Sequence, residues 1–106
     1  HMTAPASPRQ VLLDLADRAE REEPSKDLDG AIGYAVDATP KAKPVYKRGH
    51  YIGNKRVLLR IEAVWLPYTT SLDAAVTLYP KKPAIILSDP KKVCAGALRA
   101  RVAALP

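Results

Sequence analysis

The sequence predicts a single small α+β domain in which a small sheet is layered against helices. The 106 residues suit one domain with one modest core. Apolar side chains recur at helical spacing over residues 11–19 and 94–105, and they alternate with a period of two over 57–65. Residues 1–2 are interpreted as a cleaved-tag remnant followed by the start methionine. The domain is expected to span residues 7–105.

The first two helices are expected on either side of Pro24. Ser7 suits the N-cap of the first helix, and Pro24 ends it, because the residue before a proline resists helical backbone. Ser25 is expected to cap the second helix. Gly30 and Gly33 lie inside that helix and weaken it by about 1 kcal/mol each relative to alanine. Their presence favours close packing against a neighbouring element.

Residues 39–56 form a basic segment, which we expect to be a loop or a hairpin inserted into the domain. It holds two prolines, two glycines and six Lys or Arg side chains. A short strand is expected over residues 46–52, and Gly53-Asn54 suits a two-residue hairpin turn, since such turns favour glycine. Residues 57–65 follow with the clearest strand pattern in the chain, rich in β-branched and aromatic side chains.

A short helix, a strand and a last helix are expected in the rest of the chain. Thr70-Ser71-Leu72-Asp73 offers a helix start, and Pro80 ends that helix. The apolar run over residues 84–87 is interpreted as a buried strand. Asp89 is expected to cap the last helix, and Cys94 falls on the apolar face of that helix.

Reactive side chains are few. Apart from residue 1, the chain has one histidine, His50, and one cysteine, Cys94. One thiol cannot form an internal disulfide, which favours a reducing compartment, and two such ligands cannot build a zinc site of four Cys and His side chains. A pair of the His50 imidazole with the Cys94 thiol is not expected, because that thiol is expected to be buried. We therefore expect no enzyme, with no catalytic residue, no metal and no cofactor.

Charge is divided unevenly along the chain. Residues 1–39 hold four basic and eight acidic side chains, whereas residues 40–106 hold thirteen basic and three acidic ones. Such a chain either attracts an anionic partner or neutralises itself on folding. No run approaches the roughly 20 apolar residues that a membrane span needs, so no membrane partner is expected.

The candidate macromolecule-binding side chains are cationic or aromatic. They are Lys41, Lys43, Tyr46, Lys47, Arg48, His50, Tyr51, Lys55, Arg56, Lys81 and Lys82. Cations of this kind neutralise phosphates, and aromatic rings stack on unpaired bases, which is worth about 1–3 kcal/mol per base. The alternative is that the lysines solubilise a long loop and protect a sheet edge from pairing with other chains.

Three segments, in this order and spacing, resemble the phage ABA sandwich domain family of small bacteriophage and prophage proteins. They are residues 27–32, 68–80 and 94–101, and the match covers residues 11–37 and 66–103. The resemblance implies a three-layer α/β/α sandwich, with a small sheet between helices, and a viral or prophage origin. It implies no activity. The basic segment has no counterpart in the family, so strands from that region are expected to replace missing ones.

The leading hypothesis is a non-enzymatic phage or prophage accessory protein of unknown molecular role that binds a macromolecule in the cytoplasm of a bacterial host. Its partner is expected to be a protein, either from the phage or a host factor such as a defence nuclease. One alternative is direct nucleic-acid binding through residues 41–56, and another is a structural or assembly role in the virion. The partner and the oligomeric state do not follow from the sequence.

Overall fold

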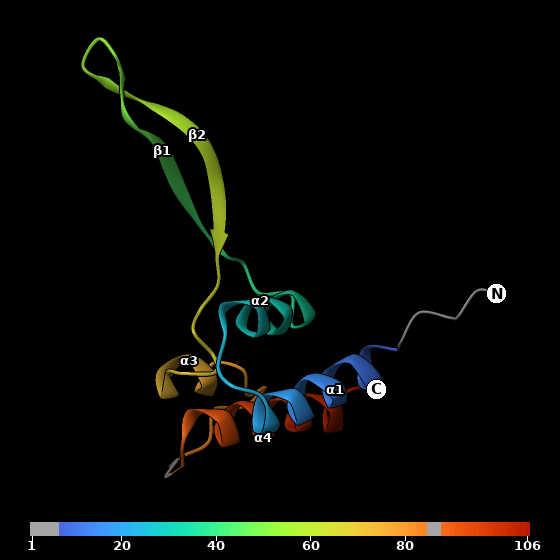
Figure 1. Ribbon diagram of the computed structural model, residues 1–106. Helices are drawn as coiled ribbons and strands as arrows, with labels where there is room; N and C mark the ends of the chain where they lie inside the picture. Colours follow the sequence, from blue (N-terminus) through green and yellow to red (C-terminus); the bar gives the residue numbers. More distant parts are fainter. Residues whose placement is uncertain (1–6, 85–87) are drawn as a thin grey trace, which may run out of the picture.

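Four helices and one antiparallel hairpin make up the part of the chain that the computed structural model describes, residues 7–84 and 88–106. The elements follow in the order α1 (Pro8–Arg21), α2 (Lys26–Ala35), β1 (Lys41–Ile52), β2 (Lys55–Val64), α3 (Leu72–Val76) and α4 (Pro90–Ala103) (Figure 1). The predicted α+β class is thereby confirmed. No helix in these ranges is long and apolar enough to cross a membrane.

Each helix begins at a side-chain cap. The Ser7 and Ser25 hydroxyls accept from the backbone N–H groups three residues later, at 3.2 and 3.0 Å. Ser71 caps α3 and Asp89 caps α4 in the same way, at 3.2 and 3.0 Å. A cap of this type contributes about 1 kcal/mol to the stability of a helix. The four helix starts expected from the sequence are therefore confirmed.

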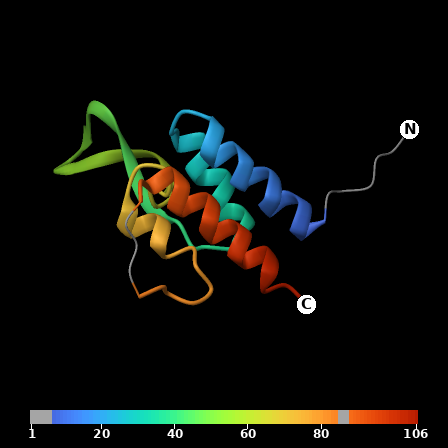
Figure 2. The same cartoon turned by 90° about the horizontal axis from the view of Figure 1, so that it is seen from below.

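The helices enclose the core. α1 lies beside α4, while α2 packs on α1 and α3 packs on α4 (Figure 2). The buried apolar side chains belong to the helices and to the segments that flank α3, and they are Leu12, Leu15, Ala16, Ala19, Leu28, Ile32, Tyr68, Ala74, Ala75, Leu78, Val93, Cys94, Ala95, Ala97, Leu98 and Val102. Cys94 is buried as expected. The folding energy of hydrophobic burial therefore resides in the helical layer.

Ion pairs join α1 to α4 at the surface. The Arg99 guanidinium of α4 donates to the carboxylates of Asp17, at 3.1 Å, and Glu20, at 2.5 Å, both on α1. The pairing lowers the pKa of the Glu20 carboxyl. Such solvent-exposed pairs are screened by water and salt and stabilise the fold only weakly. They bring acidic side chains of the N-terminal part against a cation of the C-terminal part, so the charge division along the sequence is partly neutralised on folding.

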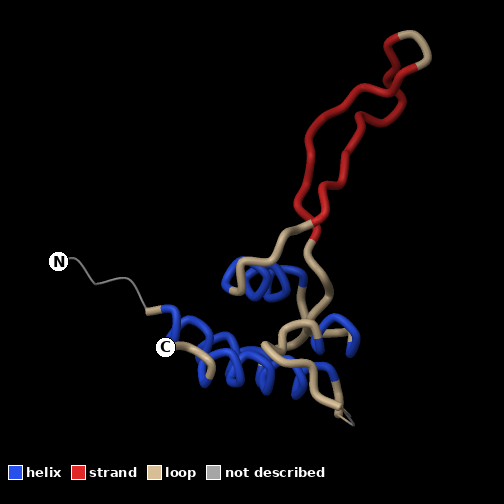
Figure 3. The backbone as a smooth tube through the Cα atoms, turned by 180° about the vertical axis from the view of Figure 1, so that it is seen from behind, coloured by secondary structure: helices blue, strands red, loops and turns tan. Residues whose placement is uncertain are grey.

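The hairpin extends away from the helices, as Figure 3 shows. Its strands are antiparallel, with Lys41 opposite Val64 and Ile52 opposite Lys55. None of the strand residues is buried. The radius of gyration is 17.3 Å, whereas a compact domain of this length has about 13 Å.

The expected three-layer arrangement is therefore corrected for the described residues: the two-stranded sheet projects from a helical layer and is not enclosed between two layers. The physical reason is that the helices pack their apolar faces against one another and form the core without the strands. Both faces of the strands therefore stay open.

Several element boundaries differ from expectation. The first strand begins at Lys41, before the expected 46–52 segment, so the basic insert is a hairpin. α3 ends at Val76, well before Pro80. The expected strand over residues 84–87 falls on 85–87, which lie outside the described residues.

Candidate macromolecule-binding hairpin

Trp65 joins the hairpin to the helical layer. It follows β2 directly, and its indole ring lies on the two glycines of α2. A Cβ at Gly33 would lie 2.9 Å from the ring atoms Cδ2 and Cζ3 and closer still to Cε3, and one at Gly30 would lie 3.2 Å from Cδ1. The close packing expected at these glycines is confirmed, and the side chain that fills the space is a tryptophan.

A buried carboxylate also holds the segment that follows β2 against α2. Asp29 of α2 is buried, and its Oδ1 accepts from the Thr69 backbone N–H at 2.9 Å and from the Thr69 hydroxyl at 2.8 Å. Hydrogen bonds to a charged acceptor are the stronger kind, and a buried one is costly to break. Asp29 and Trp65 together hold the chain that leaves β2 against α2, so the base of the hairpin is anchored while its far end is free.

The far end of the hairpin closes as the sequence predicts. Gly53 has a φ of 62° at the turn between the strands, and Gly49 has a φ of 72° within β1. Both values lie in the left-handed region that side chains with a Cβ avoid. The register shifts between Val45 and Tyr46 and again between Tyr46 and Tyr51, so the strand pairing is irregular in this part of β1.

Nine of the eleven candidate binding residues lie on the hairpin. The Arg56 guanidinium stacks on the Tyr46 ring, 4.1 Å from its centroid. One face of that ring is therefore not open to a base. The Tyr51 side chain lies opposite Arg56 and is 63 % exposed. His50 is exposed, and its Nδ1 lies 3.0 Å from the Arg48 carbonyl oxygen.

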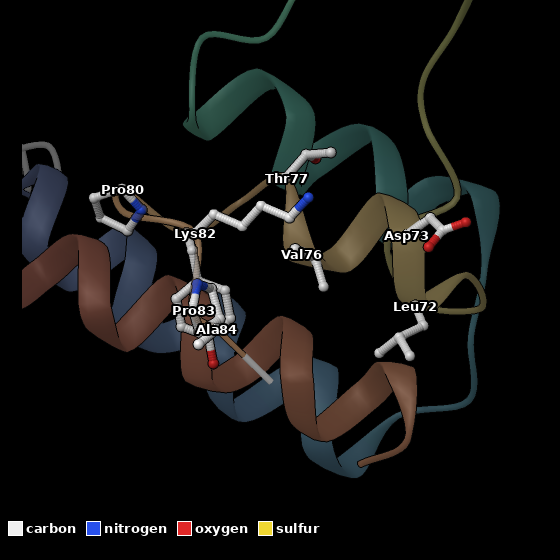
Figure 4. Close-up of a pocket in the computed structure, with 9 residues that line it drawn as sticks. Leu72, Asp73, Val76, Thr77, Pro80, Lys82, Pro83 and Ala84 are labelled. Atoms are coloured by element: carbon white, nitrogen blue, oxygen red, sulfur yellow. The ribbon is translucent and has the colours of Figure 1, made fainter. Parts of the chain in front are cut away.

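The other two candidates lie elsewhere. Lys81 borders a hollow with Ala100 and Ala104 at the end of α4. Figure 4 shows Lys82 across a second hollow, beside Thr77 and Val76. Both lysines therefore belong to the helical layer, which could not be predicted because the sequence does not indicate which face residues far apart in the chain share.

The hairpin carries the whole surplus charge of the molecule. Its 41–64 segment holds seven of the 17 Lys and Arg side chains and one of the 11 acidic ones, Glu62, so the rest of the chain has ten of each. Glu62 pairs with Arg60 at 2.8 Å. Like charges so concentrated on one projecting element attract anionic partners over about 8–10 Å in physiological salt.

Exposed aliphatic side chains accompany these cations and were not predicted as binding residues. Ile52 is 77 % exposed, Ile61 64 % and Leu59 54 %, and Leu58 is also exposed. The alternating pattern over 57–65 predicted the strand but did not indicate that its apolar side chains are exposed. These side chains are distributed along the hairpin between the cations, and their exposed apolar surface is available to another molecule.

The two reactive side chains do not meet. His50 belongs to the free part of the hairpin, whereas Cys94 lies in α4 with no exposed surface. Burial raises the pKa of the Cys94 thiol to about 12, with a further contribution from the nearby charge of Asp29. The thiol is therefore protonated at neutral pH and is a poor nucleophile.

No family model matches the chain, and neither the curated proteins nor the solved structures include a significantly similar one. The resemblance to the phage ABA sandwich domain family therefore stays a prediction.

Proposed function

We propose that this protein is a non-enzymatic accessory protein that binds an acidic protein partner through the β1–β2 hairpin. The observation that carries the proposal is the composition of the hairpin surface. All of the net charge lies there, beside aliphatic side chains that are more than half exposed. Protein interfaces combine apolar with polar side chains, and both kinds are exposed on this hairpin.

The phage or prophage origin in this proposal rests on the family resemblance alone. The single thiol supports a place in the cytoplasm of the bacterial host. The partner is either a phage protein or a host factor such as a defence nuclease, and an acidic surface on it would complement the charge of the hairpin.

Direct nucleic-acid binding is the second candidate, and the shape of the hairpin favours it. A two-stranded ribbon fits the major groove of DNA, and cations along such a ribbon can neutralise phosphates. The exposed aliphatic side chains argue against it, because phosphates and sugars would leave Ile52 and Ile61 in water.

A role in the virion is the third candidate, and self-association in light scattering is the result expected for it.

The test compares two variants that each lose four cations. One removes them from the hairpin (Lys47→Ala, Arg48→Ala, Lys55→Ala and Arg56→Ala), and the other removes them from the helical layer (Arg9→Ala, Lys26→Ala, Lys91→Ala and Lys92→Ala). Each protein is used as bait in nuclease-treated bacterial lysate, and captured proteins are purified and titrated by calorimetry. The wild type and the layer variant are expected to bind the same protein, and the hairpin variant is expected to lose it at an unchanged melting temperature.

Equal loss in both variants would contradict the proposal, because net charge alone would then explain capture. A parallel titration with double-stranded DNA separates the second candidate. Contact with four phosphates predicts a slope of about −3.6 in log K against log salt. A steep slope that flattens only in the hairpin variant, without any protein capture, would establish DNA as the partner.

A further inference from the structure

The hairpin has two outer edges, and they differ. β1 contains Pro44, which has no backbone N–H and so protects that edge from pairing. Charged side chains occur on both strands and do not distinguish the edges. β2 contains neither proline nor glycine between Lys55 and Val64. Only β2 therefore offers an outer row of backbone donors and acceptors that a proline does not interrupt.

The register indicates which groups of β2 point outward. Pro44 lies opposite Ile61. A proline fits a strand where its missing N–H would point away from the neighbour, and in such a pair the backbone groups of both residues point away from each other. The N–H and C=O of Ile61 therefore point to the free edge of β2, as do those of Ala63, two residues further along the strand.

The side chains along this edge alternate in character. Ile61 and Ala63 share the apolar face of the hairpin with Pro44, whereas Arg60 and Glu62 occupy the other face. A strand laid beside β2 would meet apolar side chains on one face and charged ones on the other. Since a two-stranded sheet with both faces open is only marginally stable, a third strand would also stabilise the hairpin.

The positive charge of the hairpin determines which kind of strand can pair with the outer edge of β2. A second copy of this hairpin would bring seven more cations against the first seven, so like charges oppose that pairing. Nucleic acid has no backbone amides with which to extend a sheet. We infer that the outer edge of β2 receives a β-strand from the partner protein, an acidic segment in which carboxylates alternate with apolar side chains. This inference deepens the proposed function and rests on it.

The probe is a dye-labelled ten-residue peptide of alternating valine and glutamate, titrated by fluorescence polarisation. Its control is a peptide of the same composition with five valines followed by five glutamates, which has the same charge but no alternation. We expect the alternating peptide to bind at least tenfold more tightly. Binding of equal strength would overturn the inference, because charge alone would then account for the affinity, and so would the absence of binding.

A pair of proline substitutions locates the edge. Ala63→Pro removes an outward N–H from β2, and Ala42→Pro removes the matching one from β1, directly opposite. Ala63→Pro is expected to weaken the alternating peptide at least tenfold, and Ala42→Pro is expected to leave its affinity unchanged. Equal effects would overturn the assignment to β2.

Amide hydrogen exchange on the wild type covers the case in which a proline variant does not fold. The peptide is expected to slow exchange at the Ile61 and Ala63 amides, and unchanged exchange at both would overturn the inference. If the hairpin variant without its four cations still loses the captured protein in that case, the proposed function stands and only the mode of binding is wrong.

Discussion

Replacing Gly33 with alanine is expected to lower the free energy of unfolding by about 1 kcal/mol, although alanine is the better helix former. The new Cβ would lie 2.9 Å from two atoms of the Trp65 ring and closer still to a third. Forcing a methyl group into such a space costs about 1–3 kcal/mol. The higher helix propensity of alanine offsets about 1 kcal/mol of that destabilisation.

Trp65→Ala and the double variant complete a double-mutant cycle. In a Trp65→Ala background the obstruction is gone, so Gly33→Ala is expected to stabilise the protein by about 1 kcal/mol. The sign of its effect should therefore reverse, with a coupling of about 2 kcal/mol between the two positions. Gly30→Ala is the matched control. Its Cβ would lie 3.2 Å from Trp65 Cδ1, a contact that a small movement of the ring relieves.

Urea unfolding followed by far-UV circular dichroism measures all of these variants, since the signal does not depend on the single tryptophan. The reasoning would be refuted if Gly33→Ala stabilised the wild type as much as it stabilises Trp65→Ala. The ring would then not rest on α2, and the hairpin would lack its anchor.

Three more outcomes follow from the buried and paired groups. Asp29→Ala is expected to cost about 2–4 kcal/mol in urea unfolding, because the Thr69 N–H and hydroxyl lose their acceptor inside the protein; a cost near zero would show that water replaces it. The Cys94 thiol, whose pKa is about 12, is expected to resist a thiol reagent at pH 8 until the chain unfolds; rapid labelling of the native protein would contradict its burial. Arg99 lowers the pKa of Glu20, so the stability that Arg99→Met removes should be present above the unfolded pKa of about 4.3 and vanish as the pH falls through the lower folded value. A difference that persists at pH 2 would assign the effect to packing of the Arg99 stem.

Local rules explain what the sequence predicted well. Caps depend on a side chain and a backbone group three residues apart, so Ser25 and Asp89 could be identified without any knowledge of the fold. The hairpin turn at Gly53 is equally local. Gly30 and Gly33 also allowed the prediction of a tertiary contact, since their cost in helix propensity indicated a closely packed neighbour.

Long-range features were not predictable in the same way. Alternation over residues 57–65 shows that a strand has two different faces, but it does not show what covers either one. The pattern therefore did not indicate that Ile61 is largely exposed. The identity of Trp65 as the neighbour of Gly33, and the bond from Thr69 to Asp29 across 40 positions, depend on how the chain returns from the hairpin.

The separation of core and hairpin has a consequence for how this surface can change. No strand residue contributes to the buried core, so substitutions along β1 and β2 remove little of the burial that stabilises the helices. Meanwhile the anchors at Trp65 and Asp29 restrict the movement of the hairpin base, which reduces the ordering cost of binding. Binding and stability therefore depend on different residues, and affinity for a partner can change at the hairpin without a compensating change in the core.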